Sequence, residues 1–302
     1  MKLHQLHDKF TKEAFSNKER AIAFFKAFLP EALLKAVDLE ELTVLEESYI
    51  TKELSAYFSD IVFDIPLANH NDRLHICLLF EHKSAPDPHI QIQVGSYIFN
   101  HWMKALKNKK ELQPIIPIVY YQGIQKWIIP AITDLFAAYP QSVSGYLPKF
   151  EQIFIPIQSL TEEQILKVKD ALMISAILSQ RFTLNPEQLL SELERIYRLL
   201  PENTLERNFV TQIFVYTLHY IKFDKAQIAA IMDNIAKPLQ KDFISTYDMI
   251  VQEGVEKGAM EKNIDVVLKG FSNGIDIEVL AKLTQLSKEE VTSILKENGV
   301  TM

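Results

Sequence analysis

Apolar and polar residues follow several different patterns along this 302-residue chain. The first forty residues have helical spacing, and Ser16 and Glu19 are placed as a capping box between two helices. Two runs of strand-forming residues follow at 59–67 and 74–83, joined by a polar loop, which predicts a β-hairpin. Repeats of three and four residues then predict a helix at 89–106.

The second half of the chain has almost purely helical spacing. Two short apolar runs, 114–121 and 150–157, have the length and β-branched content of buried strands. Beyond them, helical periodicity covers residues 161–178, 186–200, 204–221, 225–235 and 242–271. Residues 275–299 hold two short helical patterns, and Ser287 with Glu290 forms a capping box for the last helix. This pair is compatible with a DNA-reading helix-turn-helix and with an ordinary packing unit. The whole pattern predicts an α/β domain followed by an all-helical region.

Composition excludes several classes of protein. The chain is 48% hydrophobic and 24% charged, as expected of a globular protein. No apolar run is long enough for a transmembrane helix, and the first ten residues lack the apolar core of a signal peptide. A single cysteine, Cys77, excludes an internal disulfide framework. We therefore expect a cytoplasmic protein without a membrane partner.

The net charge and the local charge give opposite indications about whether the protein binds nucleic acid. The net charge of −7 argues against indiscriminate binding to phosphate backbones. Four lysines nevertheless cluster at the end of the helix predicted at 89–106; they are Lys104, Lys107, Lys109 and Lys110. A basic binding surface and a solvated helix end explain these lysines about equally well.

The predicted hairpin carries the strongest chemical signal in the chain. If Leu67 pairs with Leu74, an antiparallel register places Asp60 directly opposite Glu81, and Lys83 shares the face of Glu81. Two carboxylates at such positions lie about 5 Å apart and repel each other. A divalent cation removes this repulsion. The hairpin therefore predicts a metal site with a lysine beside it.

Other polar residues are candidates for the same site. Gln93 and Tyr97 are spaced four apart on one helix face, where they can orient a phosphate or a nucleophilic water. A solvated glutamine and a half-buried tyrosine would give the same spacing. Asp64 falls on the face of Asp60 and is either a spare metal ligand or a solvated carboxylate.

Five segments together resemble a known family. They are HDKF (7–10), FLP (28–30), YFSDIVF (57–63), LLFEHKS (78–84, with Pro86 and Asp87 after it) and LQPIIPIVYYQG (112–123). This set is similar to the Rpn family of recombination-promoting nucleases, also described as transposases of the YhgA-like type. The resemblance is strongest over residues 4–130.

The resemblance implies a PD-(D/E)XK-type mixed β-sheet flanked by helices. Asp60 matches the first acidic position of that motif, Glu81 the second, and Lys83 the lysine. Gln93 and Tyr97 match the QxxxY helix of its RecB-like branch. The implied cofactor is Mg²⁺, with Mn²⁺ as an alternative, bound by Asp60, Glu81 and the backbone carbonyl of His82. Ser59 stands where a proline is usual.

The predicted domains are a nuclease-like domain at 1–160, a helical extension packing on it at 161–240, and a helical tail at 241–302. The tail is an oligomerisation unit or a helix-turn-helix-like unit. The implied activity is a metal-dependent DNA endonuclease linked to recombination, mobile elements or defence. The alternative is a catalytically weak nuclease-fold protein that binds DNA or protein as a regulatory module. The expected partners are DNA and a second copy bound through the C-terminal helices.

Overall fold

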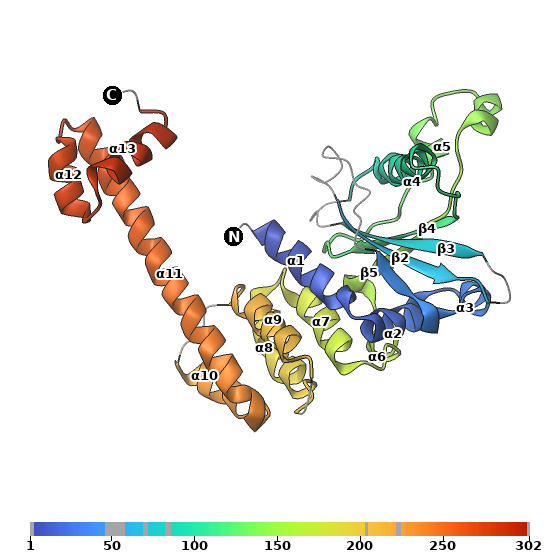
Figure 1. Cartoon of the computed structure of the whole chain (residues 1–302), viewed down its shortest axis with the longest axis horizontal. Coiled ribbons are helices and arrows are strands. Elements are labelled where there is room, and N and C mark those ends of the chain that lie inside the picture. Colours follow the sequence, from blue (N-terminus) through green and yellow to red (C-terminus); the bar gives the residue numbers. More distant parts are fainter. Residues whose placement is uncertain are drawn as a thin grey trace. The chain divides into compact units, whose positions relative to one another are not determined.

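A computed structural model of the protein describes residues 3–45, 58–68, 72–81, 86–202, 205–221 and 225–300, with the backbone alone at residues 3–5, 58–60, 77–81 and 225–226. Its centre is a five-stranded mixed sheet flanked by helices, and all-helical segments follow it in the sequence (Figure 1). This architecture confirms the predicted α/β class and is consistent with a PD-(D/E)XK-type fold.

The sheet combines an antiparallel half and a parallel half. The strands lie in sequence order: β1 (Thr43–Leu45), β2 (Phe58–Pro66), β3 (Arg73–Glu81), β4 (Ile115–Tyr121) and β5 (Ile153–Pro156). The pairs β1–β2 and β2–β3 are antiparallel, whereas β3–β4 and β4–β5 are parallel. A parallel neighbour needs a long connection, and helix α4 (Ile90–Lys107) supplies it between β3 and β4.

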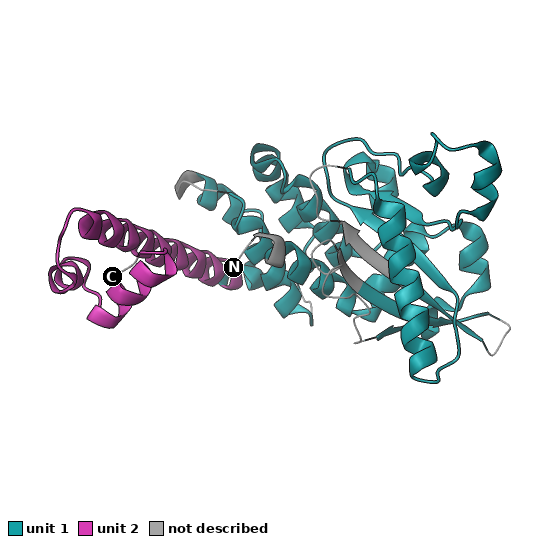
Figure 2. Ribbon diagram, turned by 90° about the horizontal axis from the view of Figure 1, so that it is seen from above, with its two compact units in different colours: residues 1–241 teal, residues 242–302 magenta. Residues whose placement is uncertain are grey.

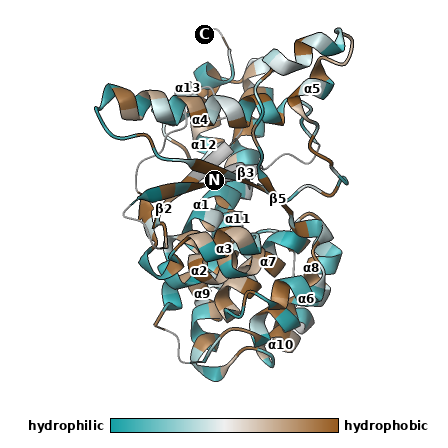
Figure 3. Cartoon of the chain, turned by 90° about the vertical axis from the view of Figure 1, so that its right-hand side faces the viewer, coloured by the Kyte–Doolittle hydropathy of each residue, from teal (hydrophilic) through white to brown (hydrophobic). Residues whose placement is uncertain are grey.

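Helix α4 covers one face of the sheet (Figure 3). Its residues Val94 and Tyr97 pack in one buried cluster with Val62 of β2 and with Val119 and Tyr121 of β4. Burying one large apolar side chain contributes about 1.5–3 kcal/mol. This cluster therefore fixes α4 on the sheet next to the predicted site, because Val62 follows position 60 by two residues and Tyr121 pairs with Glu81.

Helices α1 (Leu3–Ser16), α2 (Lys18–Phe28) and α7 (Ala171–Phe182) belong to the layer on the other face (Figure 3). The ring of Phe63, one residue after Val62, meets the rings of Phe15 and Phe25 at centroid distances of 6.4 and 4.9 Å. Tyr120 makes similar edge contacts with Phe24 at 5.9 Å. Successive residues of β2 and β4 thus face opposite layers, as the pleat requires.

The remaining helices are α3 (Glu31–Ala36), η1 (Leu39–Glu41), α5 (Ile132–Leu135), η3 (Gln141–Tyr146), η4 (Ile157–Ser159), α6 (Glu162–Leu166), α8 (Pro186–Arg198), α9 (Arg207–Leu218), α10 (Lys225–Met232), α11 (Lys237–Ser272), α12 (Ile277–Thr284) and α13 (Lys288–Glu297). None of the helices in the described part of the chain is both long and apolar enough to cross a membrane.

Two local predictions near helix ends were wrong. The capping box expected at Ser16 is absent, because Asn17 caps α2 instead, its side chain accepting the N–H of Arg20 at 3.0 Å. The helix expected at 161–178 is broken, because Lys169 has a positive φ of 55° and Asp170 begins α7 as its N-cap. The capping box of Ser287 and Glu290 is confirmed at the start of α13.

The chain divides into two compact units, Met1–Lys241 and Asp242–Met302 (Figure 2). The first unit contains the sheet and both of its covering layers. The second has its own core, in which Val267 of α11 packs with Leu280 and Val291 of the following helices. Gly270 permits this packing, because a Cβ at that position would lie 2.4 Å from a methyl carbon of Leu280.

Candidate functional site

Strands β2 and β3 place two of the predicted site residues near one end of the sheet. Asp60 is the third residue of β2 and pairs with Leu79 of β3. Glu81 ends β3, where it pairs with Phe58 of β2 and with Tyr121 of β4. The expected register, with Asp60 directly opposite Glu81, is therefore wrong by two residues.

The cause of the register shift lies at the other end of the hairpin. Pro66 pairs with Arg73, and the N–H of Leu67 donates to the carbonyl oxygen of Asp72 at 2.9 Å. Strand pairing thus includes residues that sequence reasoning assigned to the loop. The Arg73 side chain reinforces this register, since its Nε donates to Asp64 Oδ2 at 2.6 Å.

A shift of two residues preserves the face on which each residue lies. Positions 60 and 81 therefore share one face as diagonal neighbours, at about 7 Å rather than about 5 Å. It is the face that α4 covers, because Val62, two residues after position 60, packs beneath α4. The backbone thus places both acidic positions under the helix that carries Gln93 and Tyr97.

Some predicted site residues lie beyond what the structure describes. His82 and Lys83 lie outside the described residues, as do the side chains of Asp60 and Glu81. The metal-binding and catalytic roles assigned to these four residues therefore stay predictions.

The two predicted residues of α4 have well-defined surroundings. Tyr97 is 1% exposed and lies in the cluster against the sheet. One turn earlier, Gln93 donates from Nε2 to Asp87 Oδ2 at 3.0 Å. The other amide atom of Gln93, Oε1, is buried and has no hydrogen-bond partner among the described residues. A buried carbonyl oxygen without a donor is costly, so this atom is suited to accept a hydrogen bond from a bound water or ligand.

Asp87 is a positioning residue that sequence reasoning did not single out. Its side chain is 11% exposed, and Oδ1 accepts the N–H of His89, the N-cap of α4, at 2.8 Å. The same carboxylate holds the Gln93 amide through Oδ2. Asp87 therefore fixes both the start of α4 and the orientation of Gln93. An aspartate between two prolines just before a helical pattern was the available signal.

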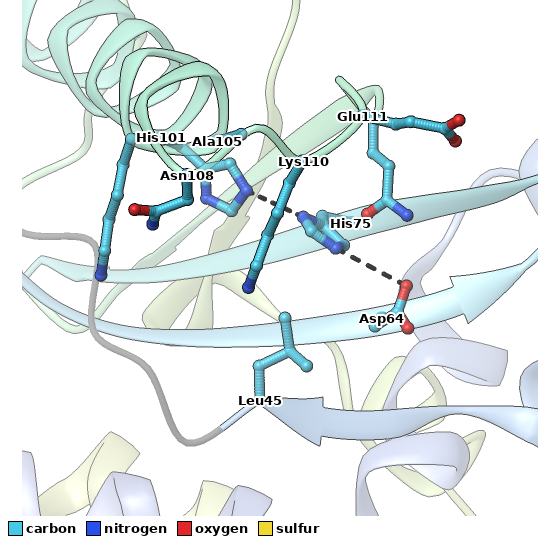
Figure 4. Close-up of a pocket in the computed structure, with 10 residues that line it drawn as sticks. Leu45, Asp64, His75, His101, Ala105, Asn108, Lys110 and Glu111 are labelled. Carbon is cyan, nitrogen blue, oxygen red and sulfur yellow. Dashed lines mark hydrogen bonds and ion pairs between the residues drawn. The ribbon is translucent and has the colours of Figure 1, made fainter.

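Asp64 is an ion-paired carboxylate, so the expectation that it is simply solvated is wrong, whereas a role as a spare metal ligand stays a prediction. Its carboxylate is 18% exposed, pairs with Arg73, and lies 3.6 Å from Nε2 of His75. His75 Nδ1 lies 2.9 Å from Nε2 of His101 on α4 (Figure 4). Burial lowers the pKa of His75 below its usual 6.5, against the opposing effect of the Asp64 carboxylate, so this imidazole is neutral at pH 7.

Comparison of the sequence with known proteins shows which family the chain belongs to. The family described as "Putative transposase, YhgA-like" matches residues 5–208, which include the sheet, both covering layers and the predicted site. The chain belongs to this family. No solved structure matches it.

Three curated relatives of this YhgA-like chain come from Escherichia coli. The inactive recombination-promoting nuclease-like protein RpnE of strain K12 is 22% identical over 94% of this chain and 96% of its own length. The recombination-promoting nuclease RpnC of the same strain is 26% identical over 39% of each chain. The recombination-promoting nuclease RpnD of O157:H7 is 24% identical over 39% of this chain and 45% of its own. Relatives named as nucleases and a relative named as inactive thus both occur.

Proposed function

We propose that this chain hydrolyses phosphodiester bonds of DNA with a divalent cation, Mg²⁺ or Mn²⁺, bound by Asp60 and Glu81. The observation that carries the proposal is the strand register. It puts the two acidic positions on one face of the sheet, beneath the helix that presents Gln93. Relatives named recombination-promoting nucleases support the same chemistry.

The chemistry of the donor set fits such a cation. Mg²⁺ and Mn²⁺ prefer oxygen ligands, and two carboxylates at diagonal positions about 7 Å apart can reach one ion between them. The backbone carbonyl of His82 would be a further oxygen ligand. When bound, the cation polarises the scissile phosphate and acidifies water.

The protein's own residues would supply positioning and charge. Lys83 would stabilise the negative charge that develops on the phosphate. Gln93 would accept a hydrogen bond from the attacking water through its buried Oε1, which has no donor among the described residues. Tyr97 would keep this amide in place, because its buried side chain packs α4 onto the sheet. The product would be cleaved DNA, in recombination, mobile-element activity or defence.

Cleavage of a supercoiled plasmid tests this proposal. Wild-type protein should nick the plasmid with Mg²⁺ or Mn²⁺ and stop when EDTA is added. Glu81→Gln and Asp60→Asn should each lower the rate about a hundredfold or more, because the cation contributes several kcal/mol to the transition state. Asp72→Asn is the matched control, since it changes an exposed carboxylate at the far end of the hairpin. Cleavage that persists in EDTA, or at the wild-type rate in Glu81→Gln, would contradict the proposal.

A second candidate function is a regulatory module that binds DNA or protein without cutting. It is favoured by the relative named inactive, which matches 94% of this chain, and by the net charge of −7. DNA binding without metal-dependent nicking in the same plasmid assay would select this alternative.

We also propose that the C-terminal unit joins two copies of the chain. Helix α11 exposes apolar side chains along its middle, including Val251, Val255 and Met260 at 44%, 67% and 43% exposure. Exposed apolar residues in succession on one helix are unusual for a surface without a partner. Sedimentation of the full chain should show a dimer that Val255→Lys weakens. A wild-type monomer at all concentrations would contradict this proposal.

A further inference from the structure

The solvent-facing side of α4 is apolar. The structure describes every residue of α4, and its exposed residues are Ile92, Phe99, Met103, Leu106 and Lys107. The four apolar side chains among them are between 46% and 64% exposed. A surface helix usually presents polar residues to solvent, and α8 exposes mainly charged and polar ones. The outer side of α4 therefore has the composition of a face that packs against a partner.

These exposed residues are not the side of α4 that the sheet needs. The sheet is already covered by the opposite side of the helix, where Val94 and Tyr97 pack in the buried cluster. Figure 3 shows α4 above the sheet, with its other side turned away from the strands. A helix that is apolar on two opposite sides is typical of a helix that is buried on both.

The exposed apolar residues form one seam along α4. Met103 follows Phe99 by four residues, Leu106 follows Met103 by three, and Ile92 precedes Phe99 by seven. This is the spacing of the apolar seam by which one helix packs along another. The remaining seam position, between Ile92 and Phe99, is held by the small, half-buried Ser96. A second helix can therefore lie along the whole seam.

The area of the seam fits a reversible contact between two copies. A large apolar side chain has a surface of about 200 Å², so four that are about half exposed present on the order of 400 Å². Two such seams bury about 800 Å² together, and the half-buried Trp102 beside them adds to this area. Weak, reversible protein contacts bury less than about 1,200 Å² in total. An exposed apolar patch of this size marks an interaction site.

The seam is complementary to itself when two copies of α4 run antiparallel. A two-fold axis midway between Phe99 and Met103 places Phe99 of one copy against Met103 of the other, and the reverse contact follows by symmetry. The same axis places Leu106 of one copy against Ser96 of the other. The small serine leaves room for the larger leucine, so large and small residues meet along the pair.

Charge favours the antiparallel orientation over the parallel one. Lys107 is exposed beside the seam at the C-terminal end of α4. A parallel pair brings the Lys107 ammonium groups of both copies side by side, where they repel each other. An antiparallel pair separates them by about 18 Å along the axis, because Lys107 lies six residues beyond the two-fold position. Opposed helix dipoles favour the same arrangement.

We propose that the exposed seam of α4 binds the same seam of a second copy of this chain, as an antiparallel pair of helices about a two-fold axis. This contact goes beyond the proposed nuclease function and does not depend on it. It is also separate from the contact proposed for α11. The tests therefore use the Val255→Lys background, in which the contribution of α11 is weakened.

Sedimentation of the full chain over a range of concentrations tests whether the seam joins two copies. The test variant is Met103→Glu, and the matched control is Leu166→Glu, which makes the same change at a leucine that is 51% exposed at the end of α6. Both positions are exposed, so neither substitution should disturb the fold, and circular dichroism checks this.

The Val255→Lys chain should form a dimer that dissociates on dilution. Met103→Glu should lower its association constant about tenfold or more, because each copy loses one apolar side chain from the contact. Leu166→Glu should leave the association constant unchanged. A Val255→Lys chain that is monomeric at every concentration, or an equal loss in Leu166→Glu, would overturn the proposal.

Disulfide cross-linking tests which residues meet and in which orientation. Chains carrying Phe99→Cys and Met103→Cys, one of them with an affinity tag so that the mixed species is resolved, are oxidised separately and together. The chain without an added cysteine, which has only Cys77, is the control for unrelated cross-links. Leu106→Cys alone reports on orientation.

The mixture should form a disulfide several-fold faster than either chain alone, because Phe99 of one copy faces Met103 of the other. Leu106→Cys alone should form little, since its two copies lie about 15 Å apart along the axis, beyond the reach of a disulfide. Rapid cross-linking of Leu106→Cys alone would indicate a parallel pair and would overturn the proposal. A mixed disulfide that forms no faster than those of the separate chains would overturn it as well.

Discussion

Replacing Asp87 by alanine removes the carboxylate that joins the start of α4 to Gln93. Its two oxygens accept the backbone N–H of His89 at 2.8 Å and Nε2 of Gln93 at 3.0 Å, and the side chain is 11% exposed. Alanine leaves both donors without this partner. The effect should therefore appear both in the stability of the α4 layer and in the orientation of the amide at the candidate site.

The expected loss of stability can be worked out from these contacts. Each hydrogen bond contributes a net of about 0.5–1.5 kcal/mol, and a negative charge near a helix N-terminus contributes about 0.3–1 kcal/mol. Asp87→Ala should lower the free energy of unfolding by about 2–3 kcal/mol. Asp87→Asn keeps one acceptor oxygen but loses the charge and one of the two hydrogen bonds, so its loss should be smaller, at about 1–2 kcal/mol.

Urea unfolding followed by tryptophan fluorescence is a suitable assay. The chain has two tryptophans: Trp102 lies on α4, and Trp127 belongs to the cluster beneath it. The signal therefore comes from the layer under test and is insensitive to independent unfolding of the C-terminal unit. Asp72→Ala, an exposed carboxylate in the hairpin, is the control.

If Asp87→Ala unfolds at the wild-type urea concentration, or if Asp72→Ala loses as much stability, the positioning role of Asp87 is refuted. Plasmid cleavage by Asp87→Ala should also fall under conditions where the variant is fully folded, because Gln93 is no longer held.

Three further predictions concern single residues of the same unit. Gly123→Ala should destabilise the protein by about 1–3 kcal/mol in the same urea assay, because a Cβ there would lie 2.0 Å from the hydroxyl oxygen of Tyr121. A variant with wild-type stability would show that the Tyr121 ring moves freely. Lys109→Gly should stabilise the protein by about 1 kcal/mol, because φ at this position is 54°. Lys107→Gly, which lies inside α4, should destabilise it by a similar amount. Equal effects of the two substitutions on stability would refute the left-handed conformation of Lys109. Stability of the wild type should fall as pH drops through 6.5, because burial lowers the pKa of His75 and the unfolded chain then binds the proton more tightly. His75→Gln should show a weaker loss over that range, and parallel pH profiles would contradict the assignment.

The sequence predicted the elements of the site better than their exact pairing. Alternating apolar residues identified β2 and β3, and three- and four-residue spacing identified α4, because these patterns follow directly from strand and helix geometry. The register was wrong by two residues, because the pairing of Pro66 with Arg73 and the ion pair of Arg73 with Asp64 extend the hairpin beyond its apolar runs. The shared face of positions 60 and 81 survived this error, since the side-chain period is two.

The cleft at the C-terminal end of α4, lined by Asp64, His75, His101 and Lys110, could not be predicted from local pattern. Asp64, His75, His101 and Lys110 come from four different segments, and their meeting depends on the sheet register and on the placement of α4. The reversal at Lys109 also lacks a sequence signal, because glycine rather than lysine is the usual residue at a positive φ. Asp87 was visible only as a turn residue, and its contact with Gln93 depends on how α4 begins.

The most direct test of the central claim is a crystal structure of the protein soaked with Mn²⁺, with the metal located by its anomalous signal. We predict one peak between the carboxyl groups of Asp60 and Glu81, on the α4 face of the sheet, and its loss in Glu81→Gln. A peak elsewhere, or carboxyl groups that point to opposite faces of the sheet, would contradict the account.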